Sequence, residues 1–352
     1  MRRNAKFLSV AVAGSLLLAA FSGCSSSGSA SPTTSGSGTA SNETVAPSSD
    51  ESPMSPATTD KSITVQLIVG VKGSPFYEAM ECGAKQAATD LGVNLKVAAG
   101  AEFAAAAQLP ILNAAIAAKP NAIALVPTDP VALNTAAQEA IKAGIKLLTV
   151  DQVLGDNTGV VTEIISDNEA GGAQAADEMA REIGESGKVL VLTTEPGQVT
   201  SQDQRAKGFV DQLKKYPNIT YVGPQYSNDD PAKTAAQVIA ELSRNSDLSG
   251  IFATNDQSGI GAASGLASAN AQGKVKLIAY DAATSQVQSL REGSVQALIA
   301  QDPHTEGIDA VKYAVAAVRG ETVPPTINTD TQLLNSASST DLLDKFEYKG
   351  NC

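Results

Sequence analysis

Two short apolar runs, each followed by an aspartate, set the strongest limit on what this chain can fold into. Residues 145–150 lead to Asp151 and residues 275–280 lead to Asp281, 130 residues further along. Short runs that are rich in aliphatic and β-branched residues are typical of buried parallel strands. Open α/β sheets bind ligands just beyond the carboxyl ends of their strands. We therefore expect Asp151 and Asp281 to face each other across a cleft between two halves of the chain.

Strand and helix patterns alternate, with short connections, from Ser62 onward. Apolar runs predict strands over residues 63–69, 93–98, 121–126, 145–150, 188–193, 219–223, 250–254, 275–280 and 295–300, with a β-rich connector at 160–165. The segments between them predict helices over residues 75–90, 104–118, 131–143, 169–183, 201–215, 231–245, 258–271, 285–292 and 303–319. This alternation predicts an α/β fold with two doubly wound parallel-sheet lobes, for which 352 residues suffice.

The first residues resemble an export signal and not a part of the fold. A basic start precedes an apolar run over residues 7–21, which is too short to span a bilayer, and small residues then lead to Cys24. A cysteine at this place resembles a bacterial lipoprotein signal, so we expect a signal peptide over residues 1–24, lipidation of Cys24 and an extracytoplasmic protein anchored to the cell membrane. Secretion without an anchor is the alternative. The Ser, Thr, Gly and Pro of residues 25–60 predict a disordered tether.

The composition argues against nucleic-acid binding and against catalysis. The formal net charge of −12 would repel nucleic-acid phosphates. The single histidine, His304, cannot form a multi-histidine zinc site, and the sequence has no G-x-S-x-G motif. The two aspartates could in principle hydrolyse a glycosidic bond, but aromatic residues make up only 4% of the chain, fewer than a sugar-cleaving cleft normally uses. We expect no enzyme, no metal and no cofactor.

Three cysteines leave one pair once Cys24 is assigned to a lipid. Outside the cytoplasm an even pair of thiols is commonly oxidised. Cys82 falls early on a predicted helix and Cys352 is the last residue, so a disulfide between them would pin the tail to the first lobe. The alternative is that Cys82 is a small buried hydrophobe and Cys352 a free thiol.

With the strands placed, the sequence resembles the ribose-binding-protein-like family, the solute receptors of sugar ABC importers, over about residues 62–330. The resemblance rests on an ordered set of motifs at the family's spacing: Ser74-Pro75-Phe76-Tyr77, Pro127-Thr128-Asp129, Asp151, Asp167-Asn168, Arg205-Ala206-Lys207-Gly208-Phe209, Asn255-Asp256, Asp281 and Gln301. It implies a type I periplasmic binding protein fold with a three-strand hinge near residues 166, 302 and 330. Lobe 1 would comprise 62–166 plus 302–330, and lobe 2 would comprise 167–301 plus 331–352.

The resemblance also implies a function. A neutral sugar or polyol would be captured between the lobes and delivered to an ABC transporter permease by a monomer held on the membrane by its lipid. A receptor that feeds a membrane sensor kinase or a chemoreceptor is the alternative, and a non-sugar polar solute would also suit such a site. Sugar-responsive repressors share the two-lobed fold, but they carry a helix-turn-helix where this chain has an export signal and a tether.

The family's ligand positions fall on residues of this chain one at a time. Phe76 and Tyr77 match rings that sandwich a sugar face. The two aspartates match carboxylates that accept hydrogen bonds from hydroxyl groups, and Asn255 and Gln301 match amides, which both donate and accept. The full implied set is Ser74, Phe76, Tyr77, Asp151, Gln152, Asp203, Asn255, Asp281 and Gln301.

Each of these residues has a structural alternative. The two aspartates could merely cap the helices that follow them, and Phe76 and Tyr77 could be core residues of the first helix. Gln301 could only fill the hinge. Two neighbours of the set are themselves expected to be structural: Arg205 as a partner within lobe 2, and Asp256 as a helix cap.

Several positions depart from the pattern of pentose receptors. Gln152 and Asp203 fall where that pattern has arginines, and Asp229 falls where it has an aromatic residue of the second lobe. These changes make the expected site more anionic. Sugar phosphates and other anions are therefore disfavoured, and a neutral sugar or polyol, with a cationic substituent as a variant, is expected. Tyr226 and Tyr280 are the candidates for the missing ring.

Overall fold

Strands and helices alternate as the sequence predicts throughout the described part of the chain, residues 60–350 and 352 of this computed structural model. The first half contains β1 (Thr64–Val69), α1 (Pro75–Leu91), β2 (Asn94–Ala99), α2 (Ala105–Ala117), β3 (Ala122–Leu125), α3 (Asn134–Lys142), β4 (Lys146–Val150) and β5 (Glu163–Ser166). The second half contains α4 (Asn168–Ile183), β6 (Gly187–Thr193), α5 (Thr200–Leu213), β7 (Ile219–Tyr226), α6 (Pro231–Arg244), β8 (Leu248–Ala253), α7 (Asp256–Ser268), β9 (Lys276–Tyr280), α8 (Thr284–Arg291) and β10 (Ala297–Ala300). The chain ends with α9 (Pro303–Val318), β11 (Thr326–Thr329), β12 (Gln332–Asn335) and α10 (Thr340–Phe346).

Helix starts follow local sequence signals. The side chain of Asp167 accepts a hydrogen bond from the backbone of Ala170 at 3.0 Å and so caps α4. Asp302 caps α9 in the same way, and Pro303 occupies the first turn, where its missing N–H has no helical partner to lose. The predicted start of α3 at residue 131 is three residues early, because Asp129 binds the backbone N–H groups of residues 131 and 132 and holds them in a turn.

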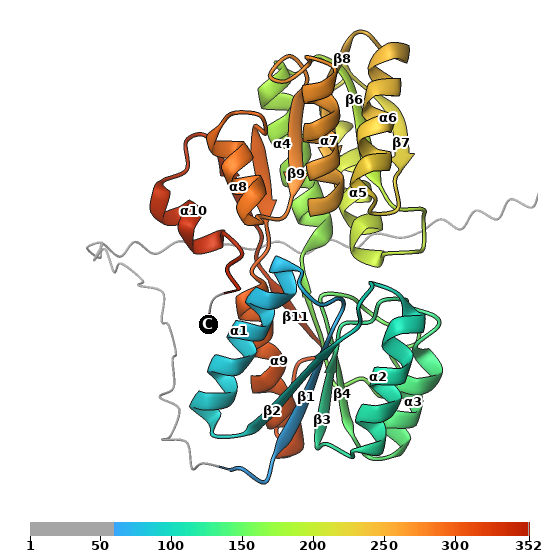
Figure 1. The fold of residues 1–352 in the computed structure, drawn as a ribbon, viewed down its shortest axis with the longest axis vertical. Coiled ribbons are helices and arrows are strands. Elements are labelled where there is room, and N and C mark those ends of the chain that lie inside the picture. Colours follow the sequence, from blue (N-terminus) through green and yellow to red (C-terminus); the bar gives the residue numbers. More distant parts are fainter. Residues whose placement is uncertain (1–59, 351) are drawn as a thin grey trace, which may run out of the picture. The chain divides into compact units, whose positions relative to one another are not determined.

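The strands form two six-stranded sheets with the same winding, in the orders β2-β1-β3-β4-β5-β11 and β7-β6-β8-β9-β10-β12 (Figure 1). Within the described residues every strand pairing is parallel except that of β10 with β12. The fold is therefore α/β with two doubly wound sheets, as predicted. In such sheets the switch in strand order opens a crevice at the carboxyl ends of the strands.

Helices cover both faces of each sheet. Neighbouring strand residues point to opposite faces, so Leu67 packs toward α1 and α9 while Ile68 packs toward α2 and α3. In the second sheet Val191 packs with α4 and α5, and Leu190 lies on the opposite face with α7 and α8. Ala, Val, Ile and Leu fill most of these layers, as the scarcity of aromatic residues predicts.

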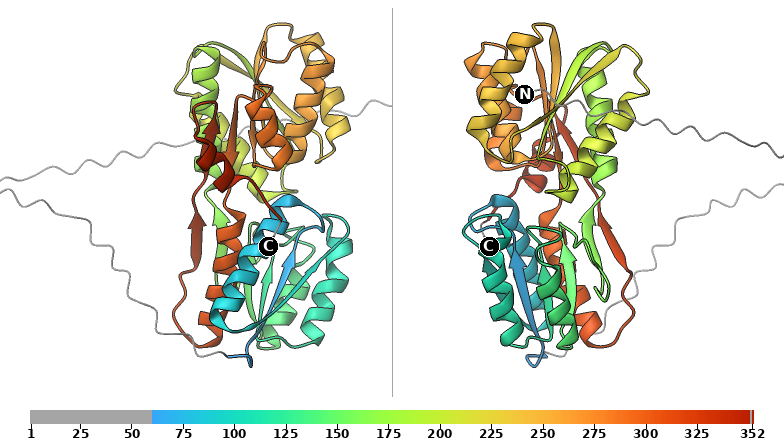
Figure 2. Two further views of the ribbon diagram at one scale, coloured as in Figure 1. Left: turned by 60° about the vertical axis from the view of Figure 1, so that its left-hand side comes forward. Right: turned by 90° about the vertical axis from the view of Figure 1, so that its right-hand side faces the viewer.

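The chain passes between the two sheets three times: from β5 to α4, from β10 to α9, and from β11 to β12. Figure 2 shows β5, β11 and α9 running side by side toward the second sheet. One buried side chain joins these crossings. The Oε1 atom of Glu306, in the first turn of α9, accepts hydrogen bonds from Ser166 Oγ at 3.0 Å and from Thr329 Oγ1 at 3.1 Å.

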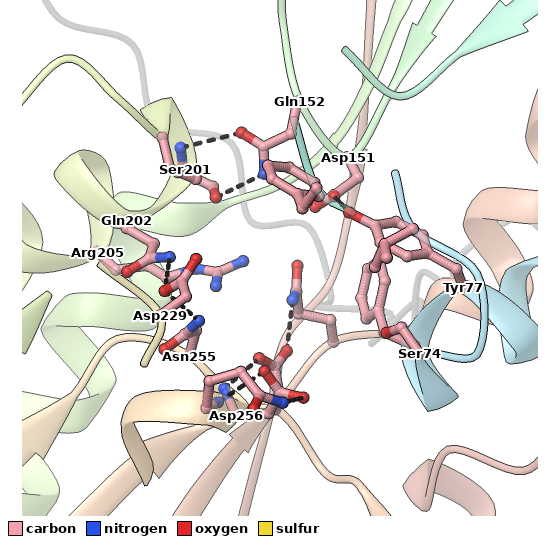
Figure 3. A pocket seen from close by; sticks show the side chains of 17 residues that line it. Ser74, Tyr77, Asp151, Gln152, Ser201, Gln202, Arg205, Asp229, Asn255 and Asp256 are labelled. Atoms are coloured by element: carbon pink, nitrogen blue, oxygen red, sulfur yellow. Dashed lines mark hydrogen bonds between the residues drawn. The ribbon is translucent and has the colours of Figure 1, made fainter. Parts of the chain in front are cut away.

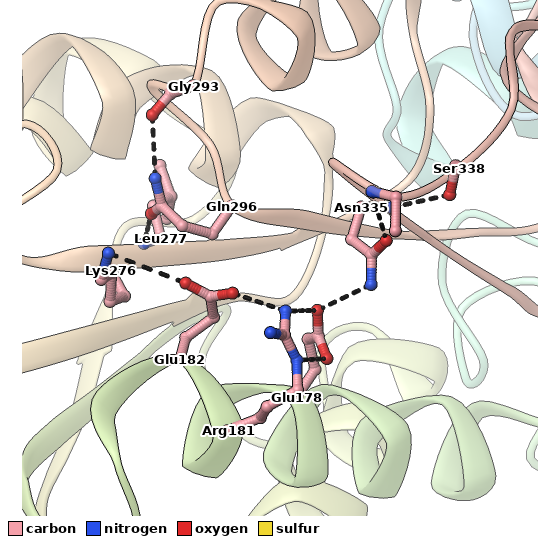
Figure 4. A network of polar contacts seen from close by, with 10 residues as sticks. Glu178, Arg181, Glu182, Lys276, Leu277, Gly293, Gln296, Asn335 and Ser338 are labelled. Atoms are coloured by element: carbon pink, nitrogen blue, oxygen red, sulfur yellow. Dashed lines mark hydrogen bonds and ion pairs between the residues drawn. The ribbon is translucent and has the colours of Figure 1, made fainter.

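The segment after residue 330 is more ordered than a tail. β12 pairs antiparallel with β10, and α10 follows it. A polar network fastens β12 to α4: Asn335 Nδ2 donates to Glu178 Oε1 at 3.0 Å, and Glu178 is held by Arg181 through two bonds of 2.7 Å (Figure 4). Glu182 of α4 adds an ion pair to Lys276 of β9 at 3.7 Å. Within residues 60–350, no helix has both the length and the apolar character needed to cross a membrane.

Candidate functional site

A cavity of about 310 Å³ lies where the carboxyl ends of strands from both sheets meet (Figure 3). This volume is within the range of small-molecule sites, roughly 300–1,000 Å³. The lining residues follow β1, β2 and β4 of the first sheet and β6 to β10 of the second. They are Val71, Ser74, Phe76, Tyr77, Phe103, Asp151, Gln152, Val199, Ser201, Gln202, Arg205, Asp229, Asn255, Asp256, Gln257, Asp281 and Gln301.

Asp151 and Asp281 occupy equivalent places in the two sheets. Both adopt a left-handed backbone, with φ of 62° and 76°, a conformation that Asp tolerates better than most residues. The backbone N–H of Asp151 donates to the carbonyl of Ile164, and that of Asp281 donates to Ile299, each at 2.8 Å. The repeated apolar run in the sequence therefore corresponds to a repeated turn at a strand end, and both carboxylates line the cavity.

The carboxylate of Asp151 is held by partners from the first sheet. Tyr77 donates its hydroxyl proton to Oδ2 at 3.0 Å, and Gln152 Nε2 donates to Oδ1 at 3.3 Å. Burial raises the pKa of Asp151 to about 6, against the opposing effects of the Arg205 guanidinium and the Tyr77 hydroxyl. In its ionised form the Asp151 carboxylate accepts hydrogen bonds from donors in the cavity.

The carboxylate of Asp281 is the centre of a second group. It accepts hydrogen bonds from Gln301 Nε2 at 2.7 Å, Tyr348 OH at 3.2 Å and the backbone N–H of Asp256 at 3.0 Å. The other amide atom of Gln301, Oε1, is buried and has no hydrogen-bond partner among the described residues.

Further polar groups come from the second sheet. Asn255 Nδ2 and Gln202 Nε2 both donate to Asp229 Oδ1, at 2.7 and 3.0 Å. Burial raises the pKa of Asp229, and it raises that of Asp256 to about 6 with a further contribution from the Asp281 carboxylate. The lining thus contains four carboxyl groups, which disfavour an anionic solute.

Arg205 is the single cation among the lining residues. Its Nε donates to Asn168 Oδ1 at 2.8 Å, its Nη1 donates to the Thr254 carbonyl at 3.0 Å, and its guanidinium lies 3.8 Å from the ring centroid of Tyr280. A guanidinium has five N–H donors, so these contacts leave capacity for a solute. Burial lowers the pKa of Arg205, but Tyr280 and the two cavity aspartates at positions 281 and 151 raise it overall, so the cation is retained.

Three aromatic rings, all from the first sheet, form the larger part of the apolar lining, to which Val71 and Val199 also belong. Phe76 packs edge-on against Tyr77 with ring centroids 5.2 Å apart. Tyr77 and Phe103 are nearly parallel, with an interplanar angle of 9° and centroids 6.5 Å apart. Such rings offer apolar faces to the C–H surface of a sugar or polyol.

Direct hydrogen bonds also connect the two sides of the cavity. Gln152, after β4, donates from Nε2 to Ser201 Oγ at 2.7 Å, and its Oε1 accepts from the backbone N–H of Ser201 at 3.4 Å. Ser201 lies in the first turn of α5 on the second sheet. The two sheets are thus linked across the cavity by protein groups alone.

Most of the residues singled out in the sequence come together at this cavity. Eight line it: Ser74, Phe76, Tyr77, Asp151, Gln152, Asn255, Asp281 and Gln301. Asp203 does not. Its carboxylate accepts a hydrogen bond from the backbone N–H of Gly197 at 2.8 Å, because Asp203 lies about 200° around the helix from Arg205, which does face the cavity.

Other expectations are corrected by the structure. Asp256 was expected to cap a helix, but the cap of α7 is Asn255, whose side chain accepts from Ser258 N at 3.1 Å, and Asp256 lines the cavity. Arg205 is bonded within its own half, in agreement with the structural role expected of it, and it lines the cavity as well. Neither Tyr226 nor Tyr280 is a lining residue; the third ring is Phe103, for which no sequence signal was available. Ser201 and Gln202, which also line the cavity, were not expected there. They lie four and three residues before Arg205, so helical spacing places them near the same face of α5 as Arg205.

Three further expectations concern a metal ion, a lipidated cysteine and a disulfide. Within residues 60–350 and 352, no group of His, Cys, Asp and Glu residues is arranged to hold a metal ion. Cys24 lies outside the described residues. Cys82 of α1 and Cys352 are joined by a disulfide with a Cα–Cα distance of 5.5 Å.

The fold and this cavity are those of a solute-binding protein with its site between two sheets. The model of the periplasmic binding protein domain matches residues 65–322, so the chain belongs to that family. A ribose import binding protein of Salmonella typhimurium is 28% identical over 273 residues, which cover 77% of this chain and 90% of the relative.

Solved structures agree with this assignment. An ABC transporter solute-binding protein from Agrobacterium vitis, bound with α-D-tagatopyranose, is 36% identical and has a TM-score of 0.78, covering 82% of this chain and 99% of its own. A carbohydrate transporter solute-binding protein from Agrobacterium radiobacter, in complex with D-arabinose, is 29% identical with a TM-score of 0.74, covering 81% and 98%. The homologues of this chain are thus solute-binding proteins of sugar ABC transporters.

Proposed function

We propose that this protein is an extracytoplasmic solute-binding protein that captures a neutral sugar or polyol in the cavity and delivers it, chemically unchanged, to an ABC importer. One observation carries the proposal: Asp151 and Asp281, from equivalent strand ends of two sheets, line the same cavity. A solute bound to both would hold the two sheets together.

The chemistry of the lining suits hydroxyl groups. A hydroxyl both donates and accepts, and the cavity offers carboxylate acceptors, the amides of Asn255 and Gln301, and the donors of Arg205. Hydrogen bonds to charged groups contribute roughly 1.5–3 kcal/mol each. Several of these, less the cost of closure, are sufficient for a micromolar dissociation constant, which corresponds to about −8.2 kcal/mol.

The acids around the solute disfavour an anion. The lining has four aspartates and one arginine, and the arginine is already bonded to protein groups. The sugars named for the relatives, ribose, tagatopyranose and arabinose, are neutral and of a size that such cavities accommodate. They support a monosaccharide or polyol as the solute class.

We further propose two lobes, with residues 62–166 plus 302–330 in lobe 1 and 167–301 plus 331–352 in lobe 2. The separate sheets and three crossings support this division. A monomer is proposed because one chain supplies the lining from both sheets. A lipid on Cys24 and a tether over residues 25–60 would hold the protein near its permease, supported by the lipoprotein-like pattern of residues 1–24.

A ligand screen tests the proposal. Thermal unfolding of the purified protein is measured with a panel of pentoses, hexoses, polyols, amino sugars and sugar phosphates. A solute at 100 times its dissociation constant should stabilise the fold by about 2.7 kcal/mol. We expect at least one neutral sugar or polyol to raise the melting temperature and to be recovered unchanged by NMR, while sugar phosphates have no effect.

The variant Asp281→Asn connects the result to the cavity. Asparagine tolerates the left-handed backbone but removes the charge, so we expect affinity for the identified solute to fall at least about tenfold by calorimetry. Asp90→Ala, an exposed carboxylate on α1, serves as the control and should bind normally. Unchanged affinity of Asp281→Asn, or conversion of the solute into a product, would contradict the proposal.

A further inference from the structure

The C-terminal segment is built into the second sheet up to Tyr348. β12 pairs with β10, and Leu343 of α10 is buried in the core. The backbone N–H of Tyr348 donates to the carbonyl of Ala282 at 3.0 Å, and Tyr348 forms an isolated parallel bridge with Ala283. These contacts place Tyr348 directly beside the strand end that carries Asp281.

The side chain of Tyr348 reaches the residues behind the cavity wall. It is only 4% exposed. Its hydroxyl oxygen accepts from the backbone N–H of Gln301 at 2.9 Å and donates to Asp281 Oδ1 at 3.2 Å. Its ring packs edge-on against Phe76 with centroids 5.5 Å apart. Tyr348 itself is not a lining residue, but it contacts three residues that are.

These three residues come from both sheets. Asp281 and Gln301 follow β9 and β10, whereas Phe76 is in the first turn of α1 on the first sheet. Tyr348 is thus a hydrogen-bonding partner on one side of the cavity and an aromatic partner on the other. A change in its position alters both sides together.

The disulfide fixes the segment beyond Tyr348 to the first sheet. Cys352 is joined to Cys82 of α1 only four residues after Tyr348. The backbone of Gly350 runs so close to α1 that a Cβ there would collide with Glu78. Four residues span at most about 13–14 Å when fully extended, and the disulfide adds a Cα–Cα distance of 5.5 Å. Cys82 of α1 therefore cannot lie further than roughly 19 Å from Tyr348 while the disulfide is intact.

We propose that Tyr348 and the Cys82–Cys352 disulfide together form a covalent strap which positions the solute site and limits its opening. In this scheme, which rests on the proposed function of solute capture, Tyr348 is a positioning residue that orients Asp281 and Gln301. The Cys82–Cys352 disulfide keeps the Tyr348 ring against Phe76. A restricted open state loses less conformational freedom on closing, so the oxidised protein binds its solute more tightly than one without the bond.

Two sets of variants test the strap on the full chain. Tyr348→Phe keeps the ring on Phe76 but removes the hydroxyl, and we expect affinity for the screened solute to fall about fivefold to tenfold at a temperature where the empty variant is still folded. Tyr348→Ala should weaken binding further. Tyr313→Phe on α9 is the control tyrosine and should bind normally.

The pair Cys82→Ser and Cys352→Ser tests the covalent part. We expect the double variant to bind the same solute about threefold to tenfold more weakly. Small-angle X-ray scattering should show a larger radius of gyration for the empty double variant than for the empty wild type, and the same radius once both are saturated with solute. A purely structural role of the bond would not produce this difference between the empty and the saturated state.

The outcomes separate the strap from the proposed function. If the wild type binds a sugar or polyol and all these variants bind it equally well, the strap is wrong and the proposed function stands. If no solute of the panel binds the wild type, the proposed function fails. The strap is then tested by the radii of gyration of the empty proteins, measured by small-angle X-ray scattering. Equal radii for the oxidised wild type and the serine variant would overturn it.

Discussion

Glu306 is a carboxyl group buried where the chain crosses between its sheets, and at the residue scale it is the most unusual side chain outside the cavity. It is fully buried, Oε1 is bonded to Ser166 and Thr329, and Oε2 has no hydrogen-bond partner among the described residues. Burial raises the pKa of Glu306 well above its usual range, and the Asp151 carboxylate raises it further. The folded protein therefore favours the protonated form.

This raised pKa predicts that folding stability depends on pH. Between the ordinary glutamate pKa, about 4.3, and the raised folded value, the folded state binds a proton that the unfolded state has released. Stability from this group is therefore present at low pH and is lost as pH rises, by up to about 1.4 kcal/mol per pH unit. Glu306→Gln replaces the acid by a neutral group of the same shape, so we expect it to raise the melting temperature at pH 8 and to have little effect at pH 4.5.

Thermal unfolding from pH 4.5 to pH 8.5 measures this difference. Glu306→Asp, which keeps the acid but shortens the side chain, should remain pH-dependent and be less stable throughout. If the melting temperatures of the wild type and of Glu306→Gln differ by the same amount at every pH, the pH dependence does not come from Glu306.

At the same scale, the sequence predicted the site where a local pattern existed. Asp151 and Asp281 were found because each ends an apolar run, and that pattern corresponds to a left-handed turn at a strand end. Asp203 was expected in the site because it falls where the pentose-receptor pattern has an arginine, but its position along the helix does not reveal which face is turned inward until the helix is packed. Phe103 follows a half-exposed strand, and nothing local to it indicates that it meets Tyr77.

At the scale of elements, glycines allow close helix packing in both halves of the molecule, and one helix pair of each half positions the cavity. In the first, α1 meets α9: a Cβ at Gly83 would collide with the His304 carbonyl, and one at Gly307 with the Met80 carbonyl. In the second, α4 meets α5: a Cβ at Gly208 would collide with the backbone of residue 169, and one at Gly172 with that of residue 205. These contacts bring the backbones close enough to place the first turns of α1 and α5 at the cavity.

Gly208→Ala is therefore expected to weaken both the fold and the site. The added methyl group must separate α4 from α5, which costs about 1–3 kcal/mol, against a gain in helix propensity of up to about 1 kcal/mol. Because Arg205 is one turn away on the same face, we expect solute affinity to fall as well.

Chemical denaturation measures the loss of stability, and calorimetry measures the loss of solute affinity. Lys207→Ala, an exposed neighbour on α5, is the control, and a Gly208→Ala variant as stable as that control would show that the contact is not tight.

The sequence was sufficient for most elements and insufficient for the last ones. Apolar runs and helix caps located β1 to β10 and α1 to α9, usually within a few residues. β11, β12 and α10 were not predicted as elements, since they are short and only partly apolar. Thr326–Thr329 is a strand because it pairs with β5, and Gln332–Asn335 because it pairs with β10, so both depend on tertiary contacts.

At the scale of the whole molecule, the balance between open and closed forms depends on contacts that join the two sheets. Gln152 and Ser201 form such a contact, with hydrogen bonds of 2.7 and 3.4 Å across the cavity. Both are buried. A net contribution of about 1 kcal/mol per bond favours the closed form before any solute is bound, and a solute can then shift the balance only by its difference in affinity for the two forms.

Breaking this contact should open the empty protein and weaken solute binding. We expect Gln152→Ala and Ser201→Ala each to lower affinity about threefold to tenfold and to enlarge the empty protein in small-angle scattering. Because the two residues act through one contact, the double variant should bind the solute scarcely more weakly than either single variant. The double-mutant cycle then separates the coupling between Gln152 and Ser201 from any direct contact of Gln152 with the solute. Gln138→Ala removes a hydrogen bond to Thr158 within the first half alone and is the control. Two results would contradict this argument: losses of affinity that add up in the double variant, or an unchanged radius of gyration of the empty variants. The closed form would then be stabilised by the hinge crossings around Glu306 and by the solute itself.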